Sequence, residues 1–217
     1  MKFSNGLTHF ETTIEHLVVA GWTGRDHALV QHHIDELGKI GVAPPTTTPL
    51  FYRVSSSLLT QVNSVQVLGP DTSGEAEPFL INHDGKLWLG LASDHTDREL
   101  EAISVAASKQ ACAKVCAAAL WDFEDVRDHT GQMQLRSWIK EHGEWVLYQD
   151  GNLEKILPLA TLGSHIENID HSAMLCGTLP AIGGVRPAVE FRAELVDPVL
   201  GHRIELQYRS EWLENIR

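Results

Sequence analysis

Residues 75–91 read EAEPFLINHDGKLWLGL, and this stretch decides the class of fold. Residues 75–81 and 86–91 are short, mostly apolar runs with the length and composition of β-strands. Between them, Asn82-His83-Asp84-Gly85 has the residues of a tight hairpin turn. The middle of the chain therefore predicts two strands joined by a hairpin, which points to a fold built on sheets.

Further β-like segments lie on both sides of this hairpin, and few segments have a helical pattern. Residues 25–40 repeat apolar side chains near a 3.6-residue period and end at Gly41, while residues 94–120 and 153–168 are the other helix candidates. Many short strands with two or three helices indicate a β-rich α+β fold, expected as a single domain over residues 1–217. The other β-like segments are residues 7–13, 15–21, 50–59, 64–68, 132–139, 144–149, 173–178, 188–196 and 203–209.

Composition argues against several functional classes. Seventeen Lys+Arg against 29 Asp+Glu give a net charge of −12, and a chain without a basic run is a poor candidate for binding nucleic acid. No apolar run approaches the roughly 20 residues that span a bilayer, and a polar amino-terminal segment with Glu11 and Glu15 is unlike a secretory signal. Three cysteines are too few for a disulfide framework. We therefore expect a cytoplasmic protein with neither nucleic acid nor membrane as a partner.

Glu75-Ala76-Glu77 is the first group that could carry chemistry. Alternate side chains of a strand share a face, so the two glutamates would lie together, with Cα atoms roughly 7 Å apart. An E-x-E alone is more often a solvated strand face than a cation site. The apolar Leu80 and Ile81 that follow indicate partial burial, which is costly for a carboxylate unless a cation or a donor compensates it.

Residues 93–100, SDHTDREL, are the second such group. Asp94 could supply a third carboxylate, and three carboxylates with waters are typical of Mg²⁺ or Mn²⁺. Asp94 or Thr96 could instead cap a following helix. Arg98 could grip a substrate carboxylate bidentately, and Lys109, a lone charge in its stretch, is either a surface residue or a functional cation.

Other candidates have a more ordinary interpretation. His27, just after a glycine turn and at a helix start, could act as a base, but surface histidines are commoner. Cys112 and Cys116 are spaced i, i+4 on a predicted Ala-rich helix and are expected to be small buried thiols rather than metal ligands.

The order of these pieces resembles the fumarylacetoacetate hydrolase superfamily. Glu75-Ala76-Glu77 lies where that family has its metal-binding E-x-E, and residues 93–100 resemble its N-D-x-[ST]-A-R-D-L segment. The similarity covers residues 17–208, and the S-D-H-T-D-R and S-K-Q signatures resemble a divergent branch of unknown function, the DUF2848 family. The remaining similar pieces are residues 19–27 (VAGWTGRDH), 49–58 (PLFYRVSSSL), 108–109 (SK), 148–152 (YQDGN) and 176–183 (CGTLPAIG).

The resemblance implies a mixed β roll with a few helices around a divalent metal, usually in a homodimer. It implies an enzyme that acts on a small 2-oxo acid, with Mg²⁺ or Mn²⁺ held by Glu75, Glu77 and Asp94. The lead function is a metal-dependent hydrolase that cleaves a C–C bond of an acylpyruvate-like β-diketo acid. His27, Arg98 and Lys109 are then the catalytic candidates, and the substrate-binding candidates are Arg53, Arg98, Lys109, Gly177 and Thr178.

Departures from the family pattern keep other functions open. Val30 stands three residues after His27, where catalytic members often carry a Glu that partners the histidine. A decarboxylase, isomerase or hydratase that works through a metal-bound enolate needs no such activated water. A non-catalytic protein that binds a metal or ligand on the same fold is the alternative from another class.

Overall fold

The computed structural model describes residues 1–39 and 43–216, apart from the side chains of His33, Glu36 and Leu37. Strands β8 (Ala76–His83) and β9 (Lys86–Asp94) pair antiparallel and confirm the central hairpin. Asp84 and Gly85 join them with φ of 52° and 71°. Two consecutive positive φ values are the backbone of the turn that best fits the twist of a two-residue hairpin, and Gly85 adopts its value without steric cost.

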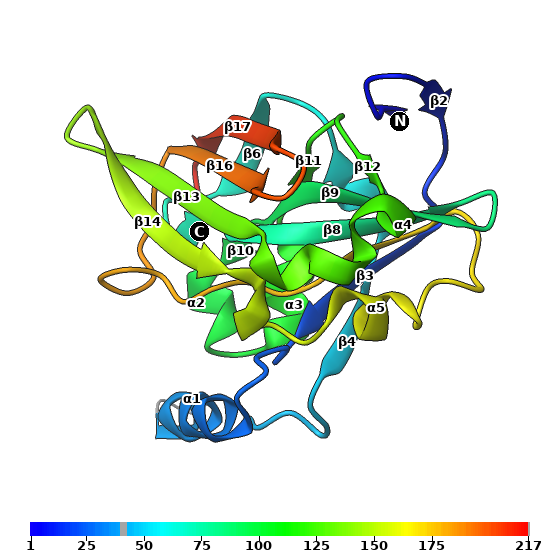
Figure 1. The fold of residues 1–217 in the computed structure, drawn as a ribbon. Helices are drawn as coiled ribbons and strands as arrows, with labels where there is room; N and C mark the ends of the chain where they lie inside the picture. The colour runs from blue at the N-terminus through cyan, green and yellow to red at the C-terminus, as the bar shows by residue number, and fades with distance from the viewer. Residues whose placement is uncertain (40–42, 217) are drawn as a thin grey trace.

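β8 and β9 lie in the middle of an eight-stranded mixed sheet. Its strands follow the order β4-β3-β15-β8-β9-β11-β5, with β12 paired to β9 (Figure 1). The β15–β3 and β11–β5 pairs are parallel, and the other pairs are antiparallel. The remaining strands of this sheet are β3 (His16–Gly21), β4 (Leu50–Val54), β5 (Leu59–Thr60), β11 (Lys114–Cys116), β12 (Trp121–Asp122) and β15 (Ser172–Leu175).

A second, five-stranded sheet packs against one face of the first. Its order is β14-β13-β16-β17-β6, and only β17–β6 is a parallel pair. Leu80 and Leu89 from the large sheet and Leu135 and Leu195 from the small one belong to one buried apolar cluster, so the main core lies between the sheets. The strands are β6 (Ser64–Leu68), β13 (Gln134–Glu141), β14 (Glu144–Asn152), β16 (Glu190–Asp197) and β17 (His202–Leu213).

The opposite face of the large sheet carries a second apolar cluster, which includes Leu17, Phe79 and Trp88. The amino-terminal pair β1 (Lys2–Ser4) and β2 (His9–Glu11) covers part of this face through Phe3 and Phe10. Two short strands pair with each other next to the hairpin. β7 (Thr72–Ser73) precedes β8 in the chain, and β10 (Thr96–Asp97) follows β9. The prediction of a β-rich α+β fold with a mixed β roll is confirmed.

The helices are shorter than predicted, apart from α1 (His27–Lys39), which projects from the body of the molecule in Figure 1. The predicted end of this helix at Gly41 lies outside the described residues. The candidate helix over residues 153–168 contains Pro158, which removes a helical hydrogen bond. Only α5 (Leu159–Gly163) forms there, after a 3₁₀ turn at Leu153–Lys155. The other helical pieces are α4 (Phe123–Val126) and 3₁₀ turns at Ser56–Leu58 and Arg127–Gln132.

The prediction of one long helix over residues 94–120 is wrong. Two short helices form instead, α2 (Arg98–Glu101) and α3 (Val105–Ala111), because Asp97 and Ser104 each accept a backbone N–H as N-caps. Residues 114–116 then pair as β11 between β9 and β5. Pairing and burial in the sheet outweigh the helix propensity of the alanines in this stretch.

Cys112 and Cys116 do not share a helix, because the first caps α3 and the second lies in β11. Both are free and buried, so the prediction that they are small buried thiols is confirmed. Burial raises the pKa of the Cys112 thiol to about 11.

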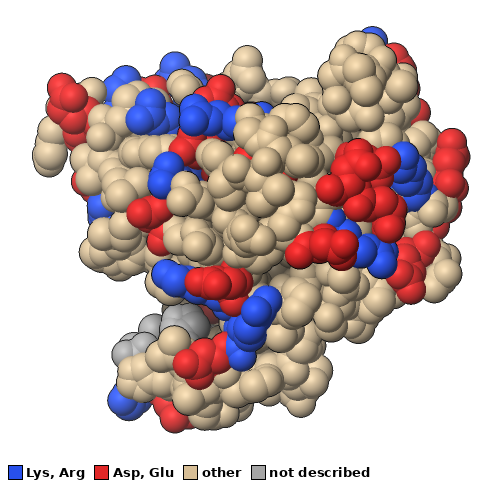
Figure 2. Space-filling model, viewed as in Figure 1, with Lys and Arg blue, Asp and Glu red and all other residues tan. Residues whose placement is uncertain are grey.

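Acidic side chains gather over α4 on the face shown in Figure 2, where Glu124 and Asp125 lie in the first turn of that helix. Elsewhere on this face Lys and Arg side chains intersperse with acidic ones. Among the described residues, no helix is long and apolar enough to cross a membrane.

Candidate metal centre

Three carboxylates meet at one end of the central hairpin. Glu75 immediately precedes β8, Glu77 is the second residue of that strand, and Asp94 is the last residue of β9. One oxygen of each lies within 4.8 Å of the others. Residues 77 and 94 are two positions from Phe79 and Ala92, so strand alternation places them on the face of the sheet that carries the second apolar cluster.

Glu77 is buried, with 2% of its surface exposed. The Gly177 N–H donates to Glu77 Oε2 at 2.7 Å. Gly177 has a φ of 96°, and a Cβ there would lie 1.8 Å from Thr23 Oγ1, so only glycine fits. The Thr178 hydroxyl donates to the Ala76 carbonyl at 2.7 Å. The loop at residues 177–178 therefore holds both the carboxylate of Glu77 and the strand that carries it.

Two buried lysines compensate Asp94, which has no exposed surface. Lys109 Nζ donates to Asp94 Oδ2, and Lys114 Nζ lies 2.8 Å from Asp94 Oδ1. Burial alone would raise the pKa of Asp94, but the ammonium groups of Lys109 and Lys114 outweigh it and hold that pKa well below the usual value. Asp94 is thus an ionised carboxylate that two lysines hold in place and that could also bind a metal cation.

Arg98 lies against Glu75. Its Nη2 is 3.1 Å from Glu75 Oε1, its Nη1 donates to Glu101 Oε2 at 2.8 Å, and its Nε donates to Ser73 Oγ at 2.7 Å. Asp97 is the N-cap of α2 and fixes where the helix starts, which sets the position of Arg98, the first residue of the helix. The structure thus joins Arg98 and Lys109, two predicted catalytic residues, to the predicted metal ligands.

Sequence reasoning missed Lys114, which is completely buried and also donates to the His95 carbonyl at 2.6 Å. It stands in QACAKVCAAAL, residues 110–120, as the only charge in an otherwise nearly apolar stretch. Lys109 drew attention because it is a lone charge in its stretch, and the same criterion would have identified Lys114.

A buried hydrogen-bond network behind the carboxylates was also missed. His95 Nδ1 lies 2.7 Å from the Tyr208 hydroxyl, and His95 Nε2 lies 2.8 Å from Thr72 Oγ1. Burial, and next the charge of Lys114, lower the pKa of His95 to about 3, so this histidine is neutral. Tyr208 comes from the second sheet, 113 residues away in sequence, and no local pattern could have predicted it.

Two predicted site residues lie outside this cluster. Arg53 is exposed on β4, with Nη2 3.1 Å from His16 Nδ1, and the strand register pairs it with Val18 of the main core. Alternation therefore places it on the opposite face of the sheet from Glu77. His27 is the exposed first residue of α1. Glu36, an acid on the same helix that could have partnered it, has a side chain outside the described set.

The donor set fits a hard divalent cation. Glu75, Glu77 and Asp94 offer only carboxylate oxygens, the ligands that Mg²⁺ and Mn²⁺ prefer. Burial, and next the charge of Asp94, raise the pKa of Glu77 well above its usual value. A bound cation would remove this penalty. The neighbouring cations already balance part of the charge, because Arg98 pairs with Glu75 and Glu101, and Lys109 and Lys114 pair with Asp94.

We expect Glu77→Gln to flatten the dependence of metal-free stability on pH. A carboxyl whose folded pKa is raised stabilises the fold below its unfolded pKa, near 4.5, and this contribution is lost as pH rises toward the folded pKa. The glutamine side chain has no such titration, and its amide oxygen can still accept from Gly177. Denaturant unfolding in EDTA at about pH 5 and about pH 8 measures the difference. Glu99→Gln, an exposed neighbour, is the control, and equal slopes for parent and Glu77→Gln would contradict the prediction.

Comparison with known proteins supports the fold. A family model described as "Protein of unknown function (DUF2848)" matches residues 20–208. No curated protein sequence matches the chain. The crystal structure of a protein named Cg1458 has a TM-score of 0.63 and 10% identity, covering 93% of this chain and 78% of that one.

The apo form of 2-keto-3-deoxy-D-arabinonate dehydratase also has a TM-score of 0.63, with 13% identity over 92% of this chain and 74% of that one. A structure of that dehydratase complexed with magnesium and 2,5-dioxopentanoate has a TM-score of 0.62 and 12% identity, covering 93% of this chain and 74% of that one. Cg1458 and the dehydratase are members of the fumarylacetoacetate hydrolase superfamily. At these identities the likeness concerns the fold, and it confirms the fold prediction.

Proposed function

The chain belongs to the DUF2848 family and has the fold of the fumarylacetoacetate hydrolase superfamily, and from these premises we propose that it is a divalent-metal-dependent enzyme acting on a 2-oxo acid. The observation that carries the proposal is the convergence of Glu75, Glu77 and Asp94 within 4.8 Å. Burial and the charge of Asp94 raise the pKa of Glu77, and a bound divalent cation would offset this cost of keeping Glu77 ionised. The magnesium and 2-oxo acid in the dehydratase structure of the same fold support this choice of ligands.

Glu75, Glu77 and Asp94 are the residues that would hold Mg²⁺ or Mn²⁺. The bound ion supplies Lewis acidity, which polarises the oxygens of a 2-oxo acid. Lys109 and Arg98 contribute positive charge next to these carboxylates, and we assign them to the substrate carboxylate and to the negative charge that develops on the substrate oxygen. Gly177 and Thr178 support Glu77 and its strand in this proposal rather than contacting substrate.

Hydrolysis of a C–C bond in an acylpyruvate-like β-diketo acid is the first candidate reaction. His27 would accept a proton from a water that attacks the second carbonyl. The C–C bond between that carbonyl carbon and the neighbouring carbon then breaks, releasing a carboxylic acid. The electron pair of the bond stays with the 2-oxo acid fragment as an enolate, next to the positive charges of Lys109 and Arg98, until a proton neutralises it.

Dehydration, decarboxylation or isomerisation of a 2-oxo acid is the second candidate, and two observations favour it. His27 is exposed at the start of α1, and the residue three positions later is Val30, which cannot orient an imidazole. One structure of the same fold is a dehydratase. These reactions need charge stabilisation from Lys109 and Arg98 but no water activated for attack on a carbonyl.

A panel of 2-oxo acids, assayed with Mg²⁺, with Mn²⁺ and with EDTA, tests the proposal. The panel contains an acylpyruvate, oxaloacetate and a 2-keto-3-deoxy sugar acid, and product analysis separates hydrolysis from decarboxylation and dehydration. We expect turnover of at least one substrate that EDTA abolishes and that Glu77→Gln lowers strongly, while Glu99→Gln retains it. Metal and ligand binding without turnover of any member would instead indicate a non-catalytic binding protein.

A further inference from the structure

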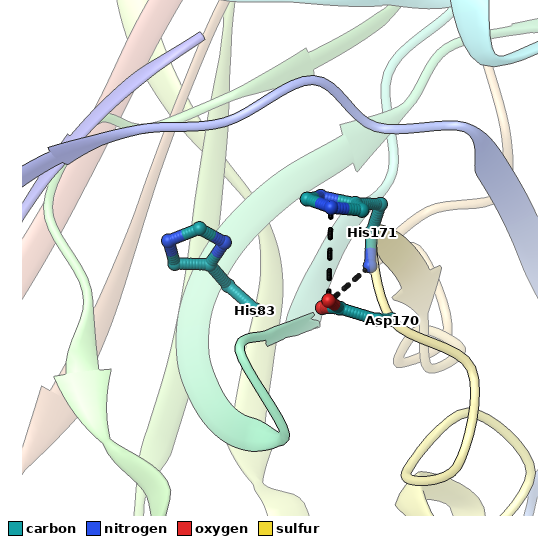
Figure 3. A group of neighbouring side chains, drawn as sticks. All are labelled: His83, Asp170 and His171. Carbon is teal, nitrogen blue, oxygen red and sulfur yellow. Dashed lines mark hydrogen bonds and ion pairs between the residues drawn. The ribbon is translucent and has the colours of Figure 1, made fainter.

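Two imidazoles and a carboxylate meet at the opposite end of β8 from the carboxylate triad. His83 is the last residue of β8, and Asp170 and His171 directly precede β15. One ligand atom of each lies within 4.8 Å of the others (Figure 3). His83 lies six positions along the strand from Glu77, about 20 Å at the usual rise, so this cluster is separate from the proposed active site.

The two ring nitrogens of His83 have different surroundings. Nε2 lies 3.6 Å from Asp84 Oδ2, and the ring stacks on Phe10 with centroids 4.6 Å apart. Nδ1 is shielded from solvent and has no hydrogen-bond partner within the part of the chain that the structure describes. Figure 3 shows one ring nitrogen turned toward Asp170 and His171. An imidazole with a carboxylate near one nitrogen and the other nitrogen unsatisfied is suited to bind a metal through the unsatisfied nitrogen.

Asp170 and His171 are held in the same manner. His171 Nδ1 lies 3.2 Å from the Thr12 hydroxyl, and its Nε2 lies 3.6 Å from Asp170 Oδ2. Asp170 Oδ1 accepts the backbone N–H groups of Asp84 and His171, each at 2.9 Å. Each side chain therefore has one atom fixed by a protein partner, and the other atom, Nε2 or Oδ2, remains available inside the cluster.

We propose that His83, Asp170 and His171 bind a divalent transition metal of the zinc class. Two imidazole nitrogens and one carboxylate oxygen are donors that suit Zn²⁺, with water completing the coordination, whereas Mg²⁺ prefers oxygen ligands alone. The ion would fasten the β8–β9 hairpin to the segment before β15, which Asp84 and Asp170 already join across 86 residues of sequence. Its role would therefore be to stabilise this end of the sheet.

Metal titration of the full-length chain tests the site. Glu75→Gln/Glu77→Gln serves as the background, because it disables the carboxylate centre and leaves the histidine cluster intact. We expect this protein to bind one equivalent of Co²⁺ with the visible absorption of a nitrogen-ligated ion, and Zn²⁺ to displace it while Mg²⁺ does not. Adding His83→Ala or His171→Ala should weaken Zn²⁺ binding at least about 100-fold, because losing a ligand weakens metal binding at least as much as losing a residue that hydrogen-bonds to a ligand.

His142→Ala removes an exposed histidine from another turn and should leave Zn²⁺ affinity unchanged. Asp170→Asn, which keeps the acceptor at Oδ1, is the second test variant if an alanine variant does not fold, and we expect the same loss of affinity from it. The proposal is overturned if the background protein binds no Zn²⁺, or if the cluster variants bind it as the background does. Thermal unfolding gives an independent readout, since Zn²⁺ should raise the Tm of the background and not that of the cluster variants.

Discussion

Asp94→Asn is expected to abolish most of the Mg²⁺ affinity and to lower the free energy of unfolding by about 3–5 kcal/mol. Asp94 has no exposed surface, and its two oxygens face the ammonium groups of Lys109 and Lys114. An asparagine keeps the shape of the side chain but leaves two buried positive charges without their partner. Denaturant unfolding in EDTA measures the stability term, and calorimetric titration with Mg²⁺ measures the affinity, which should fall at least about 100-fold.

Lys114→Met provides the matched test of this explanation. If unpaired buried charge causes the loss, the double variant Asp94→Asn/Lys114→Met should recover part of the stability of Asp94→Asn, but not its metal affinity. The lowered pKa of Asp94 also sets the direction of the pH dependence. The contribution of Asp94 to the free energy of unfolding is present above the usual pKa of 3.8 and is lost as pH falls below it. An Asp94→Asn protein that binds Mg²⁺ like the parent would refute the assignment of Asp94 as a ligand.

Features that depend on neighbouring residues could be predicted from the sequence. Strand alternation in residues 75–81 and the turn chemistry of Asp84-Gly85 are local, and both the hairpin and the proximity of Glu75 to Glu77 follow from them. The S-D-H-T-D-R segment predicts Asp94 as a ligand, but the structure places it at the end of β9, beyond the predicted strand end at residue 91. The prediction of one long helix was wrong because Asp97 and Ser104 each cap the start of a separate short helix. In addition, the residues of β11 pair in the sheet instead of continuing a helix.

Features that depend on long-range pairing could not be predicted. Gly177 reaches Glu77 across 100 residues, and Tyr208 reaches His95 across 113. These contacts exist because β15 pairs beside β8 and because the second sheet packs on the first. Arg53 also depends on long-range pairing: its motif resembles a substrate-binding strand, and the register of β4 against β3 places its side chain on the other face of the sheet from Glu77.

His27→Ala separates the two candidate reactions. His27 lies on α1 and does not belong to the carboxylate cluster, so we expect the variant to bind Mg²⁺ nearly as the parent does. If the enzyme hydrolyses a carbonyl substrate, loss of the general base should slow acylpyruvate cleavage by about 10²- to 10⁴-fold. Decarboxylation of oxaloacetate depends on charge stabilisation by Lys109 and Arg98 and should lose much less.

Rates of the parent and of His27→Ala on both substrates, measured side by side at saturating Mg²⁺, decide between hydrolysis and the lyase reactions. His9→Ala, a change at another exposed histidine, controls for a general effect of removing an imidazole. Because Val30 cannot orient the His27 ring, a large loss on the acylpyruvate would also mean that an acid from elsewhere in the chain partners it in the substrate complex. Unchanged acylpyruvate hydrolysis in His27→Ala would remove this histidine from the mechanism, and the base would then have to be sought among the groups around Glu75, Glu77 and Lys109.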